Sequence, residues 1–185
     1  MSQPLPLQAR VEAASRMAFK SRQFYSLYFA TKGEAGHRLH HGAINEYYEV
    51  IRFFEAACRD AALIELHSLF TPRKDTVNLP RLVQEMEGTV GPLNKSRQAL
   101  RAIATNLPKI KHLRDKALAH RTKLIEFNDV FREADITHVQ VSSAIDAAVV
   151  IANELRFACG LSQEPVSPAP VETYYEMLEA LRPST

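Results

Sequence analysis

Arg114 and His120 are the residues of this 185-residue chain whose types and spacing best suit chemistry. Apolar residues between Leu100 and Ala117 recur at the spacing of one helical face, and Arg114 falls on that face. An arginine in an apolar setting is costly unless it is paired or lies in a working cavity. His120 follows six residues later, and histidine titrates near neutral pH, so it can accept or donate a proton. These two side chains are the first candidates for a functional site.

A purely structural role accounts for the same arginine. Arg114 would then be the buried ion-pair partner of a glutamate such as Glu55 or Glu65, and His120 would only end a helix. On a straight helix, the six-residue step separates Arg114 from His120 by about 9 Å along the axis and about 120° around it. A shared site therefore requires either that the helix ends near His120 or that two chains contribute to it.

Basic residues are concentrated in one stretch of the chain. Residues 94–123 hold nine Lys or Arg and one Asp, a net charge of +8, which leaves −6 for the rest. A segregated basic region is typical of a surface that binds a phosphate backbone. The alternative is a solvated helix face whose lysines pair with acids of neighbouring helices. Charge alone leaves both interpretations open.

Composition excludes several classes of protein. The hydrophobic fraction of 46% and the charged fraction of 24% are ordinary for a globular domain, which excludes wholesale disorder. No apolar run approaches the roughly 20 residues of a membrane span, and the N-terminus lacks the pattern of a secretory signal. Cys58 and Cys159 are too few for a disulfide framework or a four-thiolate zinc site. We expect a cytoplasmic, helical protein without membrane attachment.

Hydrophobic periodicity predicts an all-α fold, an up-and-down bundle of four long helices plus short helices. Asn78 is expected to cap a short helix over residues 79–87, and Thr137 to cap the last long one. A bend is expected at Pro108, and Gly160 is expected to end the bundle's last helix. The long helices are predicted at residues 7–30, 43–69, 93–119 and 138–159, with loops at 31–42 and 121–136.

Two parts of the chain differ in composition. Residues 1–161 are predicted to form the helical bundle, whereas residues 162–185 hold a proline-rich linker and a short C-terminal amphipathic helix. That last helix must dock on something to bury its apolar side.

The local sequence around the two candidates resembles a known motif. Arg114, Asp115, four further residues and His120 resemble the Arg-x4–6-His motif of the HEPN superfamily, with its frequent polar residue after the arginine. The string RDKALAHRT and the segment ALIELHSLFTPRKDTVNLPRLV, residues 62–83, resemble the abortive-infection, AbiU-like branch of that superfamily. The similarity covers most of residues 7–160, including the order of long helices.

The resemblance implies a metal-independent endoribonuclease that needs no cofactor. Many HEPN proteins pair as two-fold dimers, in which two copies of the motif line one composite cleft, and they serve in antiviral defence or toxin–antitoxin systems. A partner antitoxin protein is therefore expected alongside RNA and a second copy of the chain. Some HEPN toxins carry a tyrosine two residues after the histidine, which a partner antitoxin nucleotidylates. Thr122 stands there in this chain, so that control is not carried over.

RNA supplies its own nucleophile, the 2′-hydroxyl beside each phosphodiester. In the implied reaction His120 serves as base or acid, and Arg114 contacts the non-bridging phosphate oxygens. A dimer would supply both proton-transfer roles without a metal, giving a 2′,3′-cyclic phosphate and a 5′-hydroxyl. Asp115 would orient His120 or Arg114. Flanking phosphates are assigned to Lys109, Lys111, Lys116, Arg121 and Lys123, for which plain solvation is the alternative.

Two other classes of function stay open. A non-catalytic HEPN-like module would bind RNA, a nucleotide or an antitoxin partner and would not need His120. A simple helical scaffold would show no RNA affinity even at low salt.

Other polar residues suggest weaker alternatives. His37, His40 and His41 could bind zinc or nickel, although a polar loop explains them as well. Asp60 and Glu65 could line a cleft or pair with arginines, and His67 and His112 are assigned to packing or surface positions. Both cysteines are expected to be inert. Four aromatic residues are expected mainly in the core, although some could form a dimer seam: Tyr47, Tyr48, Phe53 and Phe54.

Overall fold

The bundle is built from helices throughout the part of the chain that the structure describes. This computed structural model describes residues 5–30, 34–72, 77–119, 127–162 and 169–181. The helices are α1 (Leu7–Ala30), α2 (Glu34–Glu46), α3 (Tyr48–Phe70), α4 (Leu79–Val90), α5 (Asn94–Ile103), α6 (Leu107–Ala119), α7 (Phe127–Glu133), α8 (His138–Ala158) and α9 (Ala169–Ala180). The predicted all-α class is confirmed.

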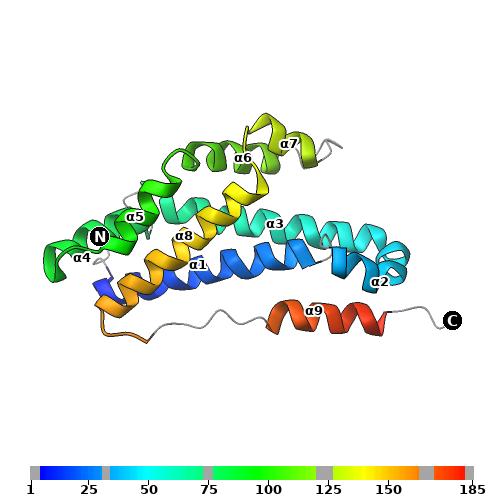
Figure 1. Cartoon of the computed structure of the whole chain (residues 1–185), viewed down its shortest axis with the longest axis horizontal. Helices are drawn as coiled ribbons and strands as arrows, with labels where there is room; N and C mark the ends of the chain where they lie inside the picture. Colours follow the sequence, from blue (N-terminus) through cyan, green and yellow to red (C-terminus); the bar gives the residue numbers. More distant parts are fainter. Residues whose placement is uncertain (1–4, 31–33, 73–76, 120–126, 163–168, 182–185) are drawn as a thin grey trace.

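Three long helices and a split fourth one enclose the core. α1 packs along α3 and α8, α5 packs on α8, and α6 packs on α3 (Figure 1). Small residues such as Ala14 and Ala18 on the buried side of α1 allow close packing, and Ser21 Oγ donates a hydrogen bond to the Ala62 carbonyl at 2.9 Å. Large apolar side chains from α3, α6 and α8 fill the interior: Leu63, Leu66, Leu69, Ile110, Leu113, Ile145, Ile151 and Leu155.

The predicted loop at residues 31–42 is wrong over its described part, because α2 begins at Glu34. Glycine costs about 1 kcal/mol in a helix, and this cost is outweighed here because α2 packs against α9. The predicted second long helix is interrupted at Tyr47, where φ is −105° and ψ is 28°. A further kink lies at His40.

The predicted helix over residues 93–119 is two helices. α5 ends at Ile103, a turn spans residues 104–106, and α6 begins at Leu107. Proline clashes with the carbonyl four residues earlier, so Pro108 is incompatible with a continuous helix but fits the first turn of a new one. The chain therefore breaks just before Pro108 instead of bending at it.

The predicted loop at residues 121–136 also contains a helix, α7, in its described part. Its buried side chains explain why: Val130 and Phe131 enter the core, followed by Ala134 and Ile136. α7 packs against α6, so tertiary contact stabilises a helix too short to persist alone.

The predicted helix caps are confirmed. Asn78 Oδ1 accepts from the Arg81 backbone N–H at 3.0 Å, although α4 then continues through Gly88 to Val90. Thr137 and Gln140 form a reciprocal capping box at the start of α8. Gly160 follows α8 with φ +72°, a conformation that favours glycine.

The C-terminal helix docks on its own chain. α9 packs against α1 and α2, and Tyr174 and Leu178 are buried beside Ile44 and Ile51 (Figure 1). The Tyr175 hydroxyl donates to the Ala30 carbonyl at 2.7 Å. None of the described helices combines the length and the hydropathy that a membrane span requires.

Candidate nucleic-acid site

Arg114 lies where α6 crosses the C-terminal end of α3. The apolar face of α6 is formed by Ile110, Leu113 and Ala117, which are buried. Around the helix axis Ala117 lies between Leu113 and Ile110, and Arg114 lies about 40° beyond Ile110, at the edge of this face. The Arg114 side chain keeps 25% of its exposure. The expectation of an arginine at the centre of the apolar stripe is therefore wrong: the guanidinium borders the core and reaches solvent.

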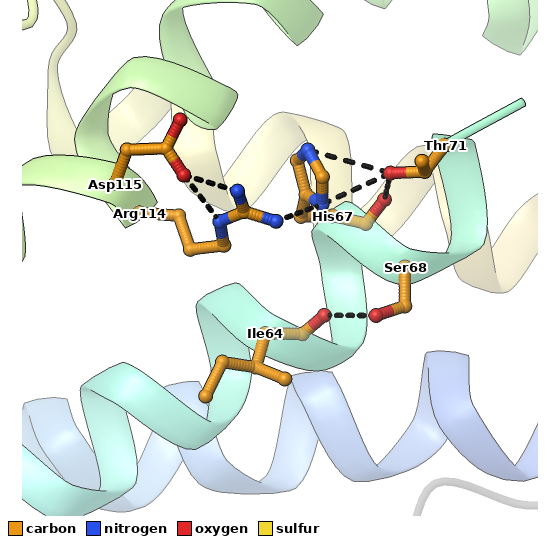
Figure 2. A network of polar contacts seen from close by, with 6 residues as sticks. All are labelled: Ile64, His67, Ser68, Thr71, Arg114 and Asp115. Carbon is orange, nitrogen blue, oxygen red and sulfur yellow. Dashed lines mark hydrogen bonds and ion pairs between the residues drawn. The ribbon is translucent and has the colours of Figure 1, made fainter. Parts of the chain in front are cut away.

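The Arg114 guanidinium contacts two side chains (Figure 2). Its Nε donates to Asp115 Oδ1 at 2.9 Å, and its Nη2 contacts the same oxygen. Its Nη1 donates to Nδ1 of His67, in α3, at 2.6 Å. The carboxylate seen beside Arg114 is thus its neighbour Asp115 and not Glu55 or Glu65. A guanidinium carries five N–H donors, and these contacts use only part of them.

Asp115 is held in its charged form. The hydrogen bond from Arg114 lowers the pKa of this carboxyl below its ordinary value, and the positive charges of Arg114 and Lys111 act in the same direction. Partial desolvation opposes the shift but does not reverse it. Asp115 is therefore an anion at neutral pH, where it can orient Arg114 but cannot serve as a general acid.

His67 and Thr71 join the contact from the end of α3. Thr71 Oγ1 lies 2.9 Å from His67 Nδ1 and 3.3 Å from Nε2, and its hydroxyl donates to the His67 carbonyl at 2.8 Å. Because Arg114 donates to Nδ1, that nitrogen must present a lone pair.

A pocket of about 590 Å³ opens beside this group, between the end of α3 and the α5–α6 break. Its apolar wall includes Leu66, Phe70, Leu107 and Ile110. Its polar residues are His67, Thr71, Lys111 and Arg114. The break in the predicted third helix creates this space, since Ala104 and Pro108 line it where a continuous helix would have passed.

The predicted phosphate-binding lysines divide into two groups. Lys109 pairs with Asp135 at 2.5 Å and Lys116 pairs with Glu133 at 3.2 Å, so acids in and after α7 neutralise both. Lys111 is exposed and lines the pocket beside Arg114. Of these three lysines, Lys111 is therefore the one that makes no ion pair among the described side chains.

His120, Arg121 and Lys123 lie outside the described residues, as does Thr122. The structure brings together Arg114, Asp115 and Lys111 of the predicted set. It also adds His67 and Thr71, which sequence reasoning left out of the site. No local signal marked them: His67 is 47 residues from Arg114, and only the packing of α6 on α3 joins them.

The remaining candidates have structural surroundings. Asp60 is buried and accepts from Arg59 Nε at 2.8 Å, which agrees with the predicted arginine pairing. Burial raises the pKa of the Cys58 thiol to about 11, with the nearby Glu55 charge as a second cause, so this thiol stays protonated. His40 is buried and stacks on Tyr175, and the side chain of His37 lies outside the described ones.

Among the described side chains, no three His, Cys, Asp or Glu gather as they would around a metal ion.

Comparison with known proteins identifies the family. The chain matches the HEPN_AbiU2 family, described as AbiU2, over residues 5–161. The protein belongs to this abortive-infection branch of the HEPN superfamily, which confirms the resemblance and the HEPN-like interpretation of the bundle. No curated protein and no solved structure matches the chain.

Proposed function

We propose that this protein is a metal-independent endoribonuclease that cleaves RNA at a composite Arg/His site between two copies of the chain. The observation that carries the proposal is the placement of Arg114. The HEPN motif predicts that Arg114 takes part in catalysis. Its guanidinium is partly exposed at the edge of a pocket, where Asp115 and His67 orient it. Antiviral defence or a toxin–antitoxin system is the proposed setting, in the cytoplasm, with an antitoxin protein as a further partner.

An exposed apolar face of α3 supports the proposed homodimer. Val50, Phe53, Ala57 and Ile64 are exposed and lie within roughly 60° of one another around the helix axis. Monomeric proteins seldom expose such a row of apolar side chains along one helix. Ile64, at one end of the row, lies three residues before His67 on α3 (Figure 2), so a second copy docked at this end would approach the Arg114 pocket. A two-fold axis near the Ile64 end of this face would bring the two motifs close together.

The proposed reaction uses the 2′-hydroxyl of RNA. One His120 removes its proton, the 2′-oxygen attacks the adjacent phosphorus, and the bond to the 5′-oxygen of the next nucleotide breaks. The His120 of the second copy donates a proton to that leaving oxygen. Arg114 stabilises the charge that develops on the non-bridging oxygens, and Asp115 keeps its guanidinium in place. The products are a 2′,3′-cyclic phosphate and a 5′-hydroxyl.

The direct test is cleavage of mixed-sequence RNA in the presence of EDTA. Wild type is expected to cleave, and His120→Ala is expected to lose cleavage at an unchanged helical content. His112→Ala is the matched control, because His112 is an exposed histidine of α6. Failure of wild type to cleave, or equal cleavage by His120→Ala, would refute the proposal.

The second candidate is a non-catalytic module that binds RNA, a nucleotide or an antitoxin partner. The Arg114–Asp115 ion pair favours it, since an arginine already paired within its own chain has fewer donors to offer a transition state. Under this alternative, His120→Ala keeps both RNA binding and the cellular effect of the wild type. Loss of growth inhibition in that variant, with folding intact, would support the nuclease instead.

A further inference from the structure

We propose that the pocket between α3 and the α5–α6 break is a nucleotide subsite, in which one base of a single-stranded RNA inserts while its phosphate contacts Lys111 and Arg114. This inference rests on the proposed function, since it takes RNA as the ligand. It assigns substrate recognition to residues of α3 and of the break, outside the Arg–His motif.

The walls of the pocket suit a nucleobase. The volume of about 590 Å³ falls within the range of about 300–1,000 Å³ that is usual for small-molecule sites. Phe70 and His67 present two rings, and Leu66, Leu107 and Ile110 complete an apolar surface. Proteins that bind single-stranded RNA commonly stack unpaired bases on aromatic side chains. Thr71 adds a hydroxyl that can bond to a base edge.

The charges at the pocket suit a phosphate. Lys111 is exposed, and among the described side chains it makes no ion pair within 4 Å. Arg114 lies three residues further along α6, just under one helical turn, and lines the same pocket. Two cations beside an apolar cavity match a ligand that is planar and apolar at one end and anionic at the other. A nucleotide unit of RNA has this character.

The position of the pocket links recognition to cleavage. Arg114 lines the pocket and is also the residue assigned to the scissile phosphate. A base held in the pocket would place its own phosphate, or the next one, against that guanidinium. The pocket would then determine which nucleotide precedes or follows the cut, so cleavage would depend on base identity at one position.

Ala104 provides a clean way to fill the pocket. It lies in the break with φ −53° and ψ −40°, a conformation open to any L-residue, and its side chain is exposed. Ala104→Trp would block the cavity without changing Arg114, Lys111 or His67. Ala102→Trp is the matched control, since Ala102 is also exposed, lies two residues earlier in α5 and does not line the pocket.

The experiment compares how tightly the protein binds two fluorescent 2′-O-methyl hexanucleotides. One carries its bases, and the other is abasic with the same phosphates. Both lack the 2′-hydroxyl nucleophile and cannot be cleaved by the proposed route. Wild type and Ala102→Trp should bind the base-bearing probe at least tenfold more tightly than the abasic one. Ala104→Trp should lose that preference. Lys111→Ala should weaken binding of both probes by a similar factor.

Three results would overturn the subsite: equal binding of both probes by wild type, an unchanged preference in Ala104→Trp, or a nucleoside 5′-monophosphate that binds wild type as tightly as the hexanucleotide. The last would identify a free nucleotide as the ligand. These readouts do not depend on cleavage, so they separate a failure of the subsite from a failure of the nuclease proposal, which is read with unmodified RNA.

Discussion

Arg114 in α6 donates a hydrogen bond to His67 in α3, with 2.6 Å between Nη1 and Nδ1 (Figure 2). The contact joins residues that are 47 positions apart in the sequence. It connects α6, which carries the proposed catalytic motif, to the C-terminal end of α3. Because Asp115 contacts the other side of the same guanidinium, Arg114 is oriented from two directions. In the proposed function, an arginine held in this way is preorganised to receive a phosphate at the pocket.

His67 is expected to act as a positioning residue for Arg114. His67→Ala removes the acceptor for Nη1 and should lower kcat for RNA cleavage about tenfold, the scale of one hydrogen bond to a charged group, with a smaller change in KM. His67→Asn keeps an acceptor oxygen and should restore most of the loss. Steady-state cleavage kinetics test this. An unchanged kcat in His67→Ala, or an Asn variant as impaired as the Ala variant, would show that the contact does not position Arg114.

Asp115 should make stability depend on pH in the acidic range. Its pKa is lower in the folded protein than the ordinary value of 3.8, so its ion pair stabilises the fold at neutral pH. This contribution begins to disappear as the pH falls below about 4 and is lost once the pH passes the folded pKa. Because the carboxylate is half exposed, the contribution is expected to stay below about 1 kcal/mol.

Urea denaturation of wild type and Asp115→Asn at a series of pH values measures this effect. The stability difference between the two proteins should be constant near neutral pH and should shrink on acidification. A difference that grows as the pH falls would contradict the assignment of Asp115 as an anion held by Arg114.

Phe53 is expected to lie in the homodimer interface. Its side chain is 78% exposed in the single chain, so Phe53→Glu should leave the fold intact while placing a charge in the α3 face. Sedimentation should then show a monomer, and RNA cleavage should fall with dimerisation. Phe157→Glu is the matched control, because Phe157 is 75% exposed on α8, outside the α3 face. If the Phe53→Glu variant stayed dimeric, or if only the Phe157→Glu variant became monomeric, the interface would lie elsewhere.

Hydrophobic periodicity was sufficient to predict the long helices α1 and α8, and the chemistry of single residues was sufficient to predict the helix caps. α1 has the predicted bounds, and Asn78, Thr137 and Gly160 act at the helix ends as expected, because caps depend on local chemistry. α2 and α7 could not be predicted, since tertiary packing stabilises them against glycines and short length. The α5–α6 break follows from Pro108. It lies at residues 104–106 and not at the proline itself, because the proline ring clashes with the carbonyl four residues earlier in a continuous helix.

The site could be predicted only where it is local. Arg114, Asp115 and Lys111 share one helix, so their proximity follows from spacing. The expectation that four aromatic residues lie mainly in the core was correct only in part: Tyr47 and Phe54 pack against buried residues, whereas Tyr48 and Phe53 are exposed. His67 could not be predicted as part of the site, because its contact with Arg114 depends on the packing of two helices that are distant in sequence. The pocket could not be predicted either, because it lies at the α5–α6 break, where the sequence predicts a single helix.

The chemistry of the cut ends tests the central claim most directly. Wild type incubated with RNA and EDTA is predicted to yield 2′,3′-cyclic phosphate and 5′-hydroxyl ends, while Arg114→Ala, His120→Ala and a 2′-O-methyl substrate yield none. Products with 5′-phosphate ends, cleavage of the 2′-O-methyl substrate, or the same cyclic ends from His120→Ala would contradict a metal-independent Arg114/His120 ribonuclease.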